Sequence, residues 1–158
     1  MTLPLVLKLL GAAMLACAGF GAGVLKCAHL RKQAESIRCF VSLLLYMSDA
    51  IHYRALPGPT VLAMAARNPA FAQFALQRCR HFSELPVPPA LGAWQGELRE
   101  GLRALESAGR ESACRTLAHL TAICRAAEQQ ARQAAAQARA LYPRLGACLG
   151  LLGALLLV

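Results

Sequence analysis

The sequence predicts an all-α protein: a cytoplasmic helical bundle of five or six helices, flanked by an N-terminal transmembrane helix and a short C-terminal transmembrane helix. Three observations support this class. Apolar residues make up 57% of the chain and their excess gathers at both ends, whereas globular proteins average about 45–50% with glycine included. Apolar positions in the middle recur at helical spacing, and no segment shows the strict alternation of a half-buried strand.

The first predicted element is the apolar run Leu3–Leu25, which contains one charge, Lys8, near its start. As a helix rising about 1.5 Å per residue, the run reaches the roughly 30 Å thickness of a bilayer's hydrocarbon core. The Lys8 ammonium can extend towards the headgroups, and Gly19 and Gly23 form a small-xxx-small pattern that suits close helix contact. We expect an uncleaved anchor. The alternative is a signal sequence cleaved near Cys17, which would need its basic residues ahead of the apolar run.

The middle of the chain is predicted to begin with a long helix that ends before a turn rich in proline, residues 56–60. Its apolar stripe is close to heptad spacing and comprises Leu30, Ile37, Phe40, Leu44, Met47 and Ile51, widened by Val41 and Leu45.

Four more helices are predicted after that turn. Thr60–Arg67 is short because Asn68-Pro69 stops it, and Glu111–Tyr142 is unbroken, with Leu117, Leu120, Ile123 and Cys124 facing the core. The other two, with their inward residues, are Phe71–Phe82 (Phe71, Phe74, Ala75 and Cys79) and Leu91–Ala108 (Trp94, Leu98, Leu102 and Leu105).

The chain ends on an apolar run with no charge after Arg144. From Leu145 onwards the run would span only about 21 Å as a helix, but Tyr142 can sit at the membrane interface and Arg144 can extend to the headgroups. We expect a short spanning helix with local thinning of the bilayer. A helix buried in a partner complex and a half-inserted hairpin are the alternatives.

Three domains follow: residues 1–25 as the N-terminal anchor, 26–140 as a cytoplasmic helical bundle and 141–158 as the C-terminal membrane segment. Basic residues flank the middle on both sides and are absent from the outer tips. By the positive-inside rule the middle domain is cytoplasmic. The seven cysteines, none at CxxC spacing, suit a reducing compartment.

Several function classes are disfavoured. The net charge is +9, but the arginines are scattered and no nucleic-acid-binding module is present. The cysteines and histidines lack the spacing of a metal site. The acidic residues stand beside arginines on polar faces, and there is no phosphate loop or catalytic motif. We therefore expect no enzyme activity, no cofactor, no metal and no small-molecule substrate.

The chain resembles the stage III sporulation protein AB family. The residues that carry the resemblance are "KLLGA" from Lys8, Arg31-Lys32, "IHYRALPGPTVL" at 51–62, Trp94 and the closing run from Leu141. The resemblance implies a membrane protein of the mother cell in endospore-forming bacteria, within a secretion-like channel complex that joins mother cell and forespore. It also implies a middle domain similar to the platform proteins of type II secretion and type IV pili, and as partners a cytoplasmic secretion-type ATPase and the complex's other membrane subunits.

The function that we expect is thus a non-enzymatic platform or adaptor that is held in the lipid bilayer and docks the ATPase. A membrane-anchored helical regulator or sensor, unconnected with secretion, is the alternative. The expected membrane-anchoring side chains are Lys8, Tyr142 and Arg144. We expect the docking face where the turn and exposed charges meet, at Ile51, Tyr53, Pro57, Pro59, Leu62, Arg99 and Arg103.

Overall fold

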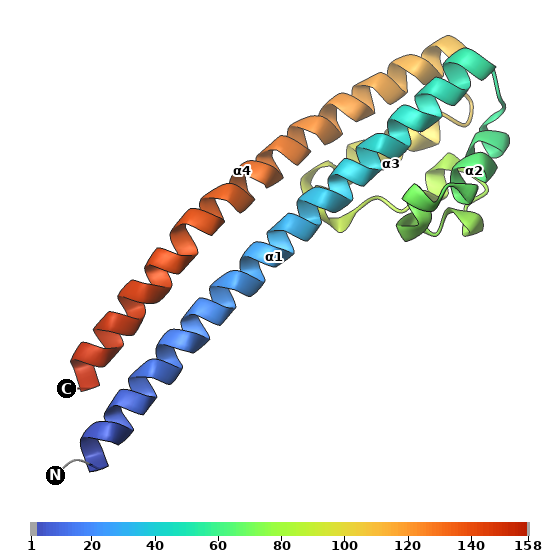
Figure 1. Cartoon of the computed structure of the whole chain (residues 1–158). Coiled ribbons are helices and arrows are strands. Elements are labelled where there is room, and N and C mark those ends of the chain that lie inside the picture. The colour runs from blue at the N-terminus through green and yellow to red at the C-terminus, as the bar shows by residue number, and fades with distance from the viewer. Residues whose placement is uncertain (1–2, 158) are drawn as a thin grey trace. The chain divides into compact units, whose positions relative to one another are not determined.

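The computed structural model of the chain describes residues 3–157, and it contains helices and no strand over that range (Figure 1). The predicted all-α class is confirmed. Two helices are long, α1 (Leu3–Arg54) and α4 (Arg110–Leu157). Between them in sequence lie α2 (Gly58–Arg67), α3 (Gln95–Ala104) and four 3-10 helices: η1 (Pro69–Phe74), η2 (Leu76–Arg78), η3 (Phe82–Glu84) and η4 (Pro89–Trp94).

The predicted terminal helices are not separate elements. Leu3–Leu25 continues into the next predicted helix within the 52 residues of α1, and the run from Leu141 continues from the preceding helix within the 48 residues of α4. The count of five or six helices is therefore wrong for the described residues, which hold four α-helices and four short 3-10 helices. The physical reason at the first junction is simple: Leu25-Lys26-Cys27 contains no glycine or proline that would end a helix.

The chain divides into two compact units, which are described separately. The helix-pair unit comprises Met1–Lys32 and Ala131–Val158, and the core unit comprises Gln33–Gln130. Each unit takes one part of α1 and one part of α4. The predicted domain limits at residues 25 and 140 stay predictions.

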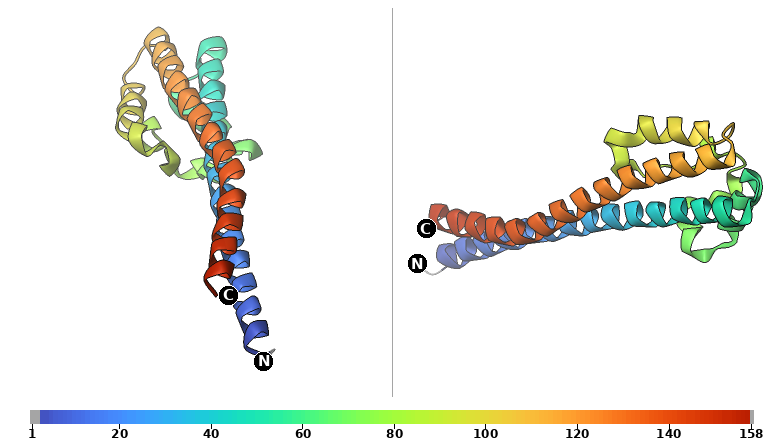
Figure 2. Two further views of the ribbon diagram at one scale, coloured as in Figure 1. Left: turned by 90° about the vertical axis from the view of Figure 1, so that its left-hand side faces the viewer. Right: turned by 90° about the horizontal axis from the view of Figure 1, so that it is seen from above.

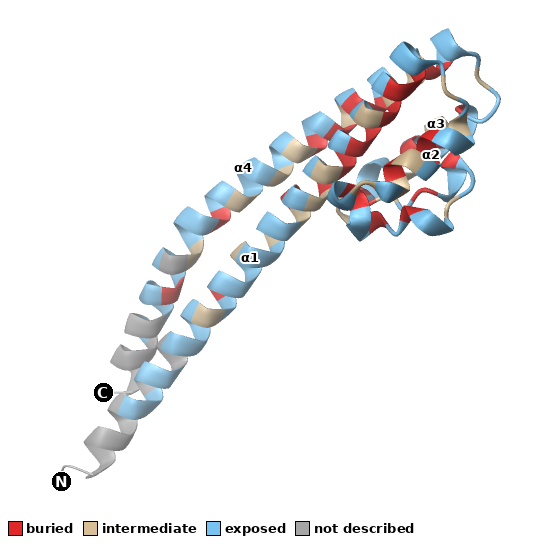
Figure 3. Ribbon diagram, turned by 45° about the vertical axis from the view of Figure 1, so that its right-hand side comes forward, coloured by how far each residue is buried: buried red, intermediate tan, exposed pale blue. Residues whose placement is uncertain are grey.

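The core unit holds most of the buried side chains, as the clustering of buried residues in Figure 3 shows. On α1 the predicted stripe is largely confirmed, with Ile37, Phe40, Leu44 and Met47 almost fully buried. Leu43, which was not in the predicted stripe, is also fully buried, whereas Leu45 is 36% exposed. The rest of this core comes from other elements: Val61, Leu62, Phe71, Phe74, Leu76, Phe82, Leu85, Leu91, Leu98, Leu102, Leu105, Leu117 and Leu120.

The prediction for α2 is confirmed at its C-terminal end. The helix stops at Arg67, and Asn68 takes an extended conformation before Pro69. The Asn68 side chain accepts a hydrogen bond of 3.0 Å from the backbone amide of Ala70, so it caps the 3-10 helix that follows.

The predicted helix Phe71–Phe82 is wrong. The chain instead forms the short 3-10 helices η1 and η2, separated by Ala75, whose φ of 47° is left-handed. A left-handed residue ends a right-handed helix, and this conformation costs about 1–2 kcal/mol when the residue is not glycine. Phe71 and Phe74 are buried as predicted, but Ala75 is exposed and Cys79 is half-buried, and Leu76 takes up core space instead.

The predicted helix Leu91–Ala108 is shorter and preceded by a different element. Residues up to Trp94 form η4, α3 starts at Gln95, and it ends at Ala104. Trp94 is 38% exposed, so its predicted place in the stripe is wrong. Leu98, Leu102 and Leu105 are buried as predicted.

Close packing joins α3 to α4 in the core unit. A Cβ added at Gly101 would lie 2.7 Å from Leu120 Cδ2, so the glycine lets Leu120 approach the α3 backbone. On α4, Leu117, Leu120 and Cys124 face the core as predicted, while Ile123 is half-buried. The buried Thr121 hydroxyl donates a 2.7 Å hydrogen bond to the Leu117 carbonyl, which satisfies it within the helix.

In the helix-pair unit the N-terminal part of α1 and the C-terminal part of α4 run antiparallel and next to each other, as the right-hand view of Figure 2 shows. A Cβ added at Gly23 would lie 3.1 Å from Tyr142 Cβ, and one at Gly146 would lie 3.5 Å from the Phe20 nitrogen. A later residue of α1 thus contacts an earlier residue of α4, as antiparallel packing requires. Gly23 makes the close contact that the small-xxx-small pattern predicts.

Within the described part of the chain, no helix offers a stretch that is both apolar enough and long enough for a bilayer crossing. The two predicted membrane segments therefore stay predictions. The Lys8 side chain, predicted to help anchor the first of them, lies outside the described residues.

Candidate functional site

The corner between α1 and α2 is built by three consecutive conformational constraints. Ala55, directly after α1, has a left-handed φ of 49°. Pro57 is extended, and its carbonyl accepts hydrogen bonds from the amides of Thr60 and Val61, at 3.0 and 3.1 Å. Pro59 occupies the first turn of α2, where its missing N–H costs nothing. The chain therefore reverses within a few residues and directs α2 back against the core.

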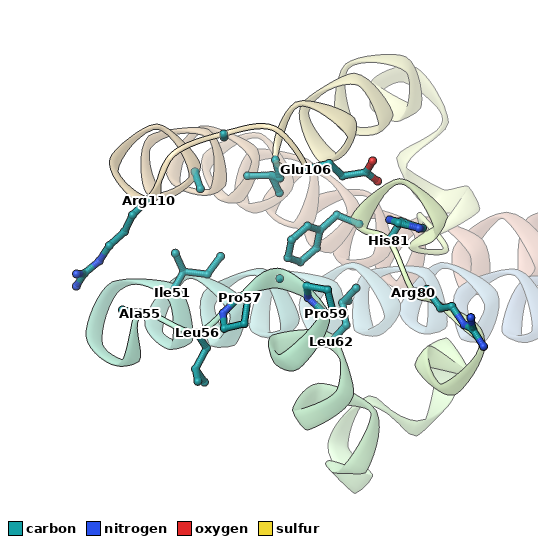
Figure 4. A pocket seen from close by; sticks show the side chains of 15 residues that line it. Ile51, Ala55, Leu56, Pro57, Pro59, Leu62, Arg80, His81, Glu106 and Arg110 are labelled. Carbon is teal, nitrogen blue, oxygen red and sulfur yellow. The ribbon is translucent and has the colours of Figure 1, made fainter.

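A cavity of about 580 Å³ opens at this corner of the core unit (Figure 4). The end of α1 and the start of α2 supply one side of its lining. Residues 80–82, the segment that joins α3 to α4 and the first turn of α4 supply the rest. The lining comprises Ile51, Ala55, Leu56, Pro57, Gly58, Pro59, Leu62, Arg80, His81, Phe82, Leu105, Glu106, Ala108, Arg110 and Ala113.

The Phe82 ring lines the cavity and is tightly enclosed. It is buried, and a Cβ added at Gly58 would lie 2.6 Å from Phe82 Cε2 and 3.1 Å from Phe82 Cζ. Gly58 is thus required at this place for the ring to lie against the first turn of α2.

A short hydrogen-bonded turn holds Phe82 in place. The Glu84 carboxylate accepts hydrogen bonds from the amides of Arg80 and His81, at 2.7 and 3.4 Å. These backbone bonds are the main cause that lowers the pKa of Glu84. The carboxylate is therefore ionised at neutral pH and keeps the turn closed.

A second carboxylate ties the turn to the end of α3. Glu106 Oε1 accepts a hydrogen bond from the Ser83 hydroxyl, at 2.5 Å, and from the Ser83 amide, at 3.1 Å. The hydroxyl bond is the largest cause that lowers the pKa of Glu106, followed by the amide bond, and the positive charge of Arg103 adds to it. One oxygen of the only acidic residue in the lining is thus already engaged by the protein.

The cationic groups of the lining differ in their engagement. The Arg110 guanidinium donates to the backbone carbonyl of His52, which connects the start of α4 to the end of α1. Arg80 is exposed and lines both this cavity and a neighbouring one of about 770 Å³. Its guanidinium forms no ion pair with the carboxylates of the described residues. The lining therefore offers an available positive charge beside apolar surface.

The structure brings together four of the seven predicted docking residues. Ile51, Pro57, Pro59 and Leu62 line the cavity. Tyr53 is 78% exposed and lies outside the lining, with its ring edge-on against His52 at a centroid distance of 4.6 Å. Arg99 and Arg103 are exposed on α3 and are also outside the lining.

Sequence reasoning missed the residues that complete the cavity, mainly Arg80, His81, Phe82 and Glu106. The hydrogen bond between Ser83 and Glu106 joins residues 23 positions apart, and no local sequence pattern predicts it. The proline at 57 followed by a glycine was a usable signal, because Gly58 marks the place where another side chain comes close.

The remaining predicted residues lie in the helix-pair unit. Tyr142 is half-buried against Gly23, and Arg144 is exposed on α4.

Among the residues that the structure describes, no group of three His, Cys, Asp or Glu side chains is placed to hold a metal ion. Cys124 is buried in the core unit, and this burial raises the pKa of its thiol to about 12.

The fold and the corner cavity define an all-helical protein with a partly apolar, partly cationic hollow in its core unit. The sequence model of one family, described as stage III sporulation protein AB, matches residues 8–108, more than half of the chain. The chain therefore belongs to the stage III sporulation protein AB family, and it is a sporulation-related protein.

The matched range includes most of α1, the corner, α2, all four 3-10 helices and α3. Residues 109–158, with α4 and the apolar C-terminal run, lie outside it, although that run was among the residues on which the resemblance was based. Neither the curated proteins nor the solved structures include a match to this chain.

Proposed function

We propose that this protein is a non-enzymatic membrane platform subunit of the secretion-like channel complex between mother cell and forespore, and that it docks a cytoplasmic secretion-type ATPase. The observation that carries the proposal is the corner cavity in the core unit of a chain from this sporulation family. Four residues that the sequence singled out for docking line it: Ile51, Pro57, Pro59 and Leu62.

The chemistry of the cavity suits a protein segment better than a small metabolite. Its walls are mostly aliphatic, aromatic or proline side chains, and its polar groups are few. The charges of Arg80 and Arg110 favour an acidic partner segment that also carries an apolar anchor residue. Glu106 is an opposing negative charge in the lining, and hydrogen bonds from the Ser83 amide and hydroxyl hold one of its oxygens in the turn.

The proposed location is the mother-cell membrane around the forespore, with two membrane segments and the core unit in the cytoplasm. In support, the large apolar side chains that are exposed in the helix-pair unit suit lipid contact. They are Leu10, Met14, Phe20, Val24, Leu25, Leu141, Leu145, Leu149 and Leu152. Small residues at the contact of α1 with α4, such as Gly23, suit helix packing in a bilayer.

Replacement of Arg80 by Glu is expected to weaken co-purification of the ATPase by about tenfold, since one lost attraction and one new repulsion together exceed about 1.4 kcal/mol. Arg80→Glu should leave the helical content unchanged, because the side chain is exposed and only the backbone amide of Arg80 is used in the turn. The measurement is a pull-down from sporulating cells with a tagged full chain.

The matched control is Arg99→Glu, which makes the same charge change at an exposed residue of α3 outside the cavity. It should retain the ATPase. Loss of the ATPase with Arg99→Glu and retention with Arg80→Glu would shift the docking face to α3 and contradict the cavity as the docking site.

Tyr53→Cys in a variant whose native cysteines are replaced by Ala tests the side of the membrane. The side chain at residue 53 is 78% exposed, so the new thiol is accessible wherever the core unit lies. A membrane-impermeant maleimide is expected to label it only after the cells are permeabilised. Labelling in intact cells would place the core unit outside the cytoplasm and favour the sensor alternative over the platform.

A further inference from the structure

The helix-pair unit has a one-sided charge. Its two segments contain no aspartate or glutamate, so all eight acidic residues of the chain lie in the core unit. The same two segments carry seven basic residues: Lys8, Lys26, Arg31, Lys32, Arg132, Arg139 and Arg144. The side chains of this unit therefore carry a net positive formal charge.

A groove of about 390 Å³ lies between α1 and α4 within this unit. Its α1 wall repeats at helical spacing, so that the apolar Phe20 and Val24 are followed on the same face by Cys27 and Arg31. Gly23 and Ala28 complete the α1 wall. The other wall is supplied by Ala138, Arg139 and Tyr142 of α4.

One end of the groove is apolar and the other end is cationic. Phe20 and Val24, at one end, are 54% and 52% exposed. Arg31, at the other end, lies eleven residues and about 16 Å further along α1. Arg139 reaches the same groove from α4. A ligand that fits would therefore have a long apolar part and an anionic group at one end.

Helix packing fixes the two walls. Tyr142 lies against Gly23, where an added Cβ would be 3.1 Å from Tyr142 Cβ, and Cys27 Sγ lies 4.0 Å from the Ala135 carbonyl oxygen. This close approach places the α4 residues beside the exposed stripe of α1, so the groove is a fixed feature of the pair.

We propose that this groove binds one phospholipid with an acidic headgroup, with its phosphate between Arg31 and Arg139 and an acyl chain along Val24 and Phe20. Guanidinium groups pair with phosphate oxygens through two parallel hydrogen bonds, and a phosphate with an attached acyl chain is the ligand that uses both ends of the groove. The cationic character of the unit favours an acidic lipid over a zwitterionic one. This inference rests on the membrane location given under Proposed function.

The test is native mass spectrometry of the full chain released from detergent micelles that contain equal amounts of phosphatidylglycerol and phosphatidylcholine with identical acyl chains. One phosphatidylglycerol per chain should be retained in preference to phosphatidylcholine by about tenfold or more. The double variant Arg31→Gln, Arg139→Gln should lose that preference. The control Lys26→Gln, Lys32→Gln removes two charges from α1 outside the groove lining and should keep it.

A second variant probes the apolar end. Val24→Trp fills the groove next to Phe20 and should reduce retention of phosphatidylglycerol while all basic residues remain. Added inorganic phosphate should not displace the lipid, because it lacks the acyl chain. Displacement by phosphate, or equal retention of both lipids by the unaltered chain, would overturn the lipid assignment. So would unchanged lipid retention by Val24→Trp together with loss of partner subunits, which would make the groove a protein-binding surface.

Flotation with vesicles of phosphatidylcholine alone separates this inference from the proposed function. A chain that floats with neutral vesicles but shows no preference for phosphatidylglycerol keeps its proposed membrane location and loses the lipid site. A chain that floats with neither kind of vesicle contradicts both.

Discussion

Phe40→Ala is expected to lower the free energy of unfolding of the core unit by about 3–5 kcal/mol, the range for removal of a fully enclosed aromatic ring. Phe40 has no exposed surface, and its ring lies edge-on to Phe74 with centroids 5.8 Å apart. The variant leaves a cavity between α1 and η1 and removes that ring contact. Thermal unfolding followed by circular dichroism in detergent should show a fall in Tm on the order of 10 °C.

The control for this prediction is Leu45→Ala on the same helix. Leu45 is 36% exposed, so its truncation should cost less than about 1 kcal/mol. Equal losses for the two variants would mean that α1 presents a different face to the core from the one described.

Gly58→Ala is expected to destabilise the core unit by about 1–3 kcal/mol, although alanine is the better helix former. The new methyl group would lie 2.6 Å from Phe82 Cε2, and the buried ring would have to move away from α2. Because Phe82 lines the corner cavity, the same variant should also weaken co-purification of the proposed ATPase partner. Chemical denaturation and the pull-down measure the two effects.

Gly96→Ala is the matched control, since a Cβ added at Gly96 in α3 meets nothing within 4 Å. This substitution should stabilise the protein by about 0.5–1 kcal/mol, the ordinary gain from replacing a helical glycine. A stabilising effect of Gly58→Ala as well would contradict the tight contact between α2 and Phe82.

The stripe on α1 could be predicted from the sequence because burial along one helix face leaves a periodic record. Its errors have a geometric cause. Heptad spacing assumes one partner along one seam, whereas η1 also packs on α1 through the pairs Phe40–Phe74 and Tyr46–Phe71. The buried face of α1 therefore differs from a coiled-coil seam. It includes Leu43 and leaves Leu45 exposed.

The segment after Asn68 could not be predicted in the same way. Its apolar spacing fits a helix, but Ala75 adopts a left-handed conformation that alanine rarely takes. That conformation is stabilised by tertiary contacts, since Phe74 and Leu76 on either side of it are both buried. A single sequence contains no signal for such a residue.

The candidate site likewise has a part that could be predicted from the sequence and a part that could not. The part from Ile51 to Leu62 follows from a helix end, two prolines and a glycine, all of which the sequence shows. The rest depends on contacts between distant segments, such as the bond from Arg110 to the His52 carbonyl across 58 residues. Arg99 and Arg103, chosen for their charge, lie on α3 away from the lining.

The concentration of acidic residues in one unit has a kinetic consequence for docking. The core unit contains ten Lys and Arg residues against eight Asp and Glu residues, so it is almost electrically balanced. Long-range steering of a partner towards the corner is then weak, and the association rate should be that of an ordinary unsteered encounter, with little response to ionic strength. Recognition at the corner would depend on shape and on the local charge of Arg80 at short range, and selectivity would lie in a slow dissociation rate.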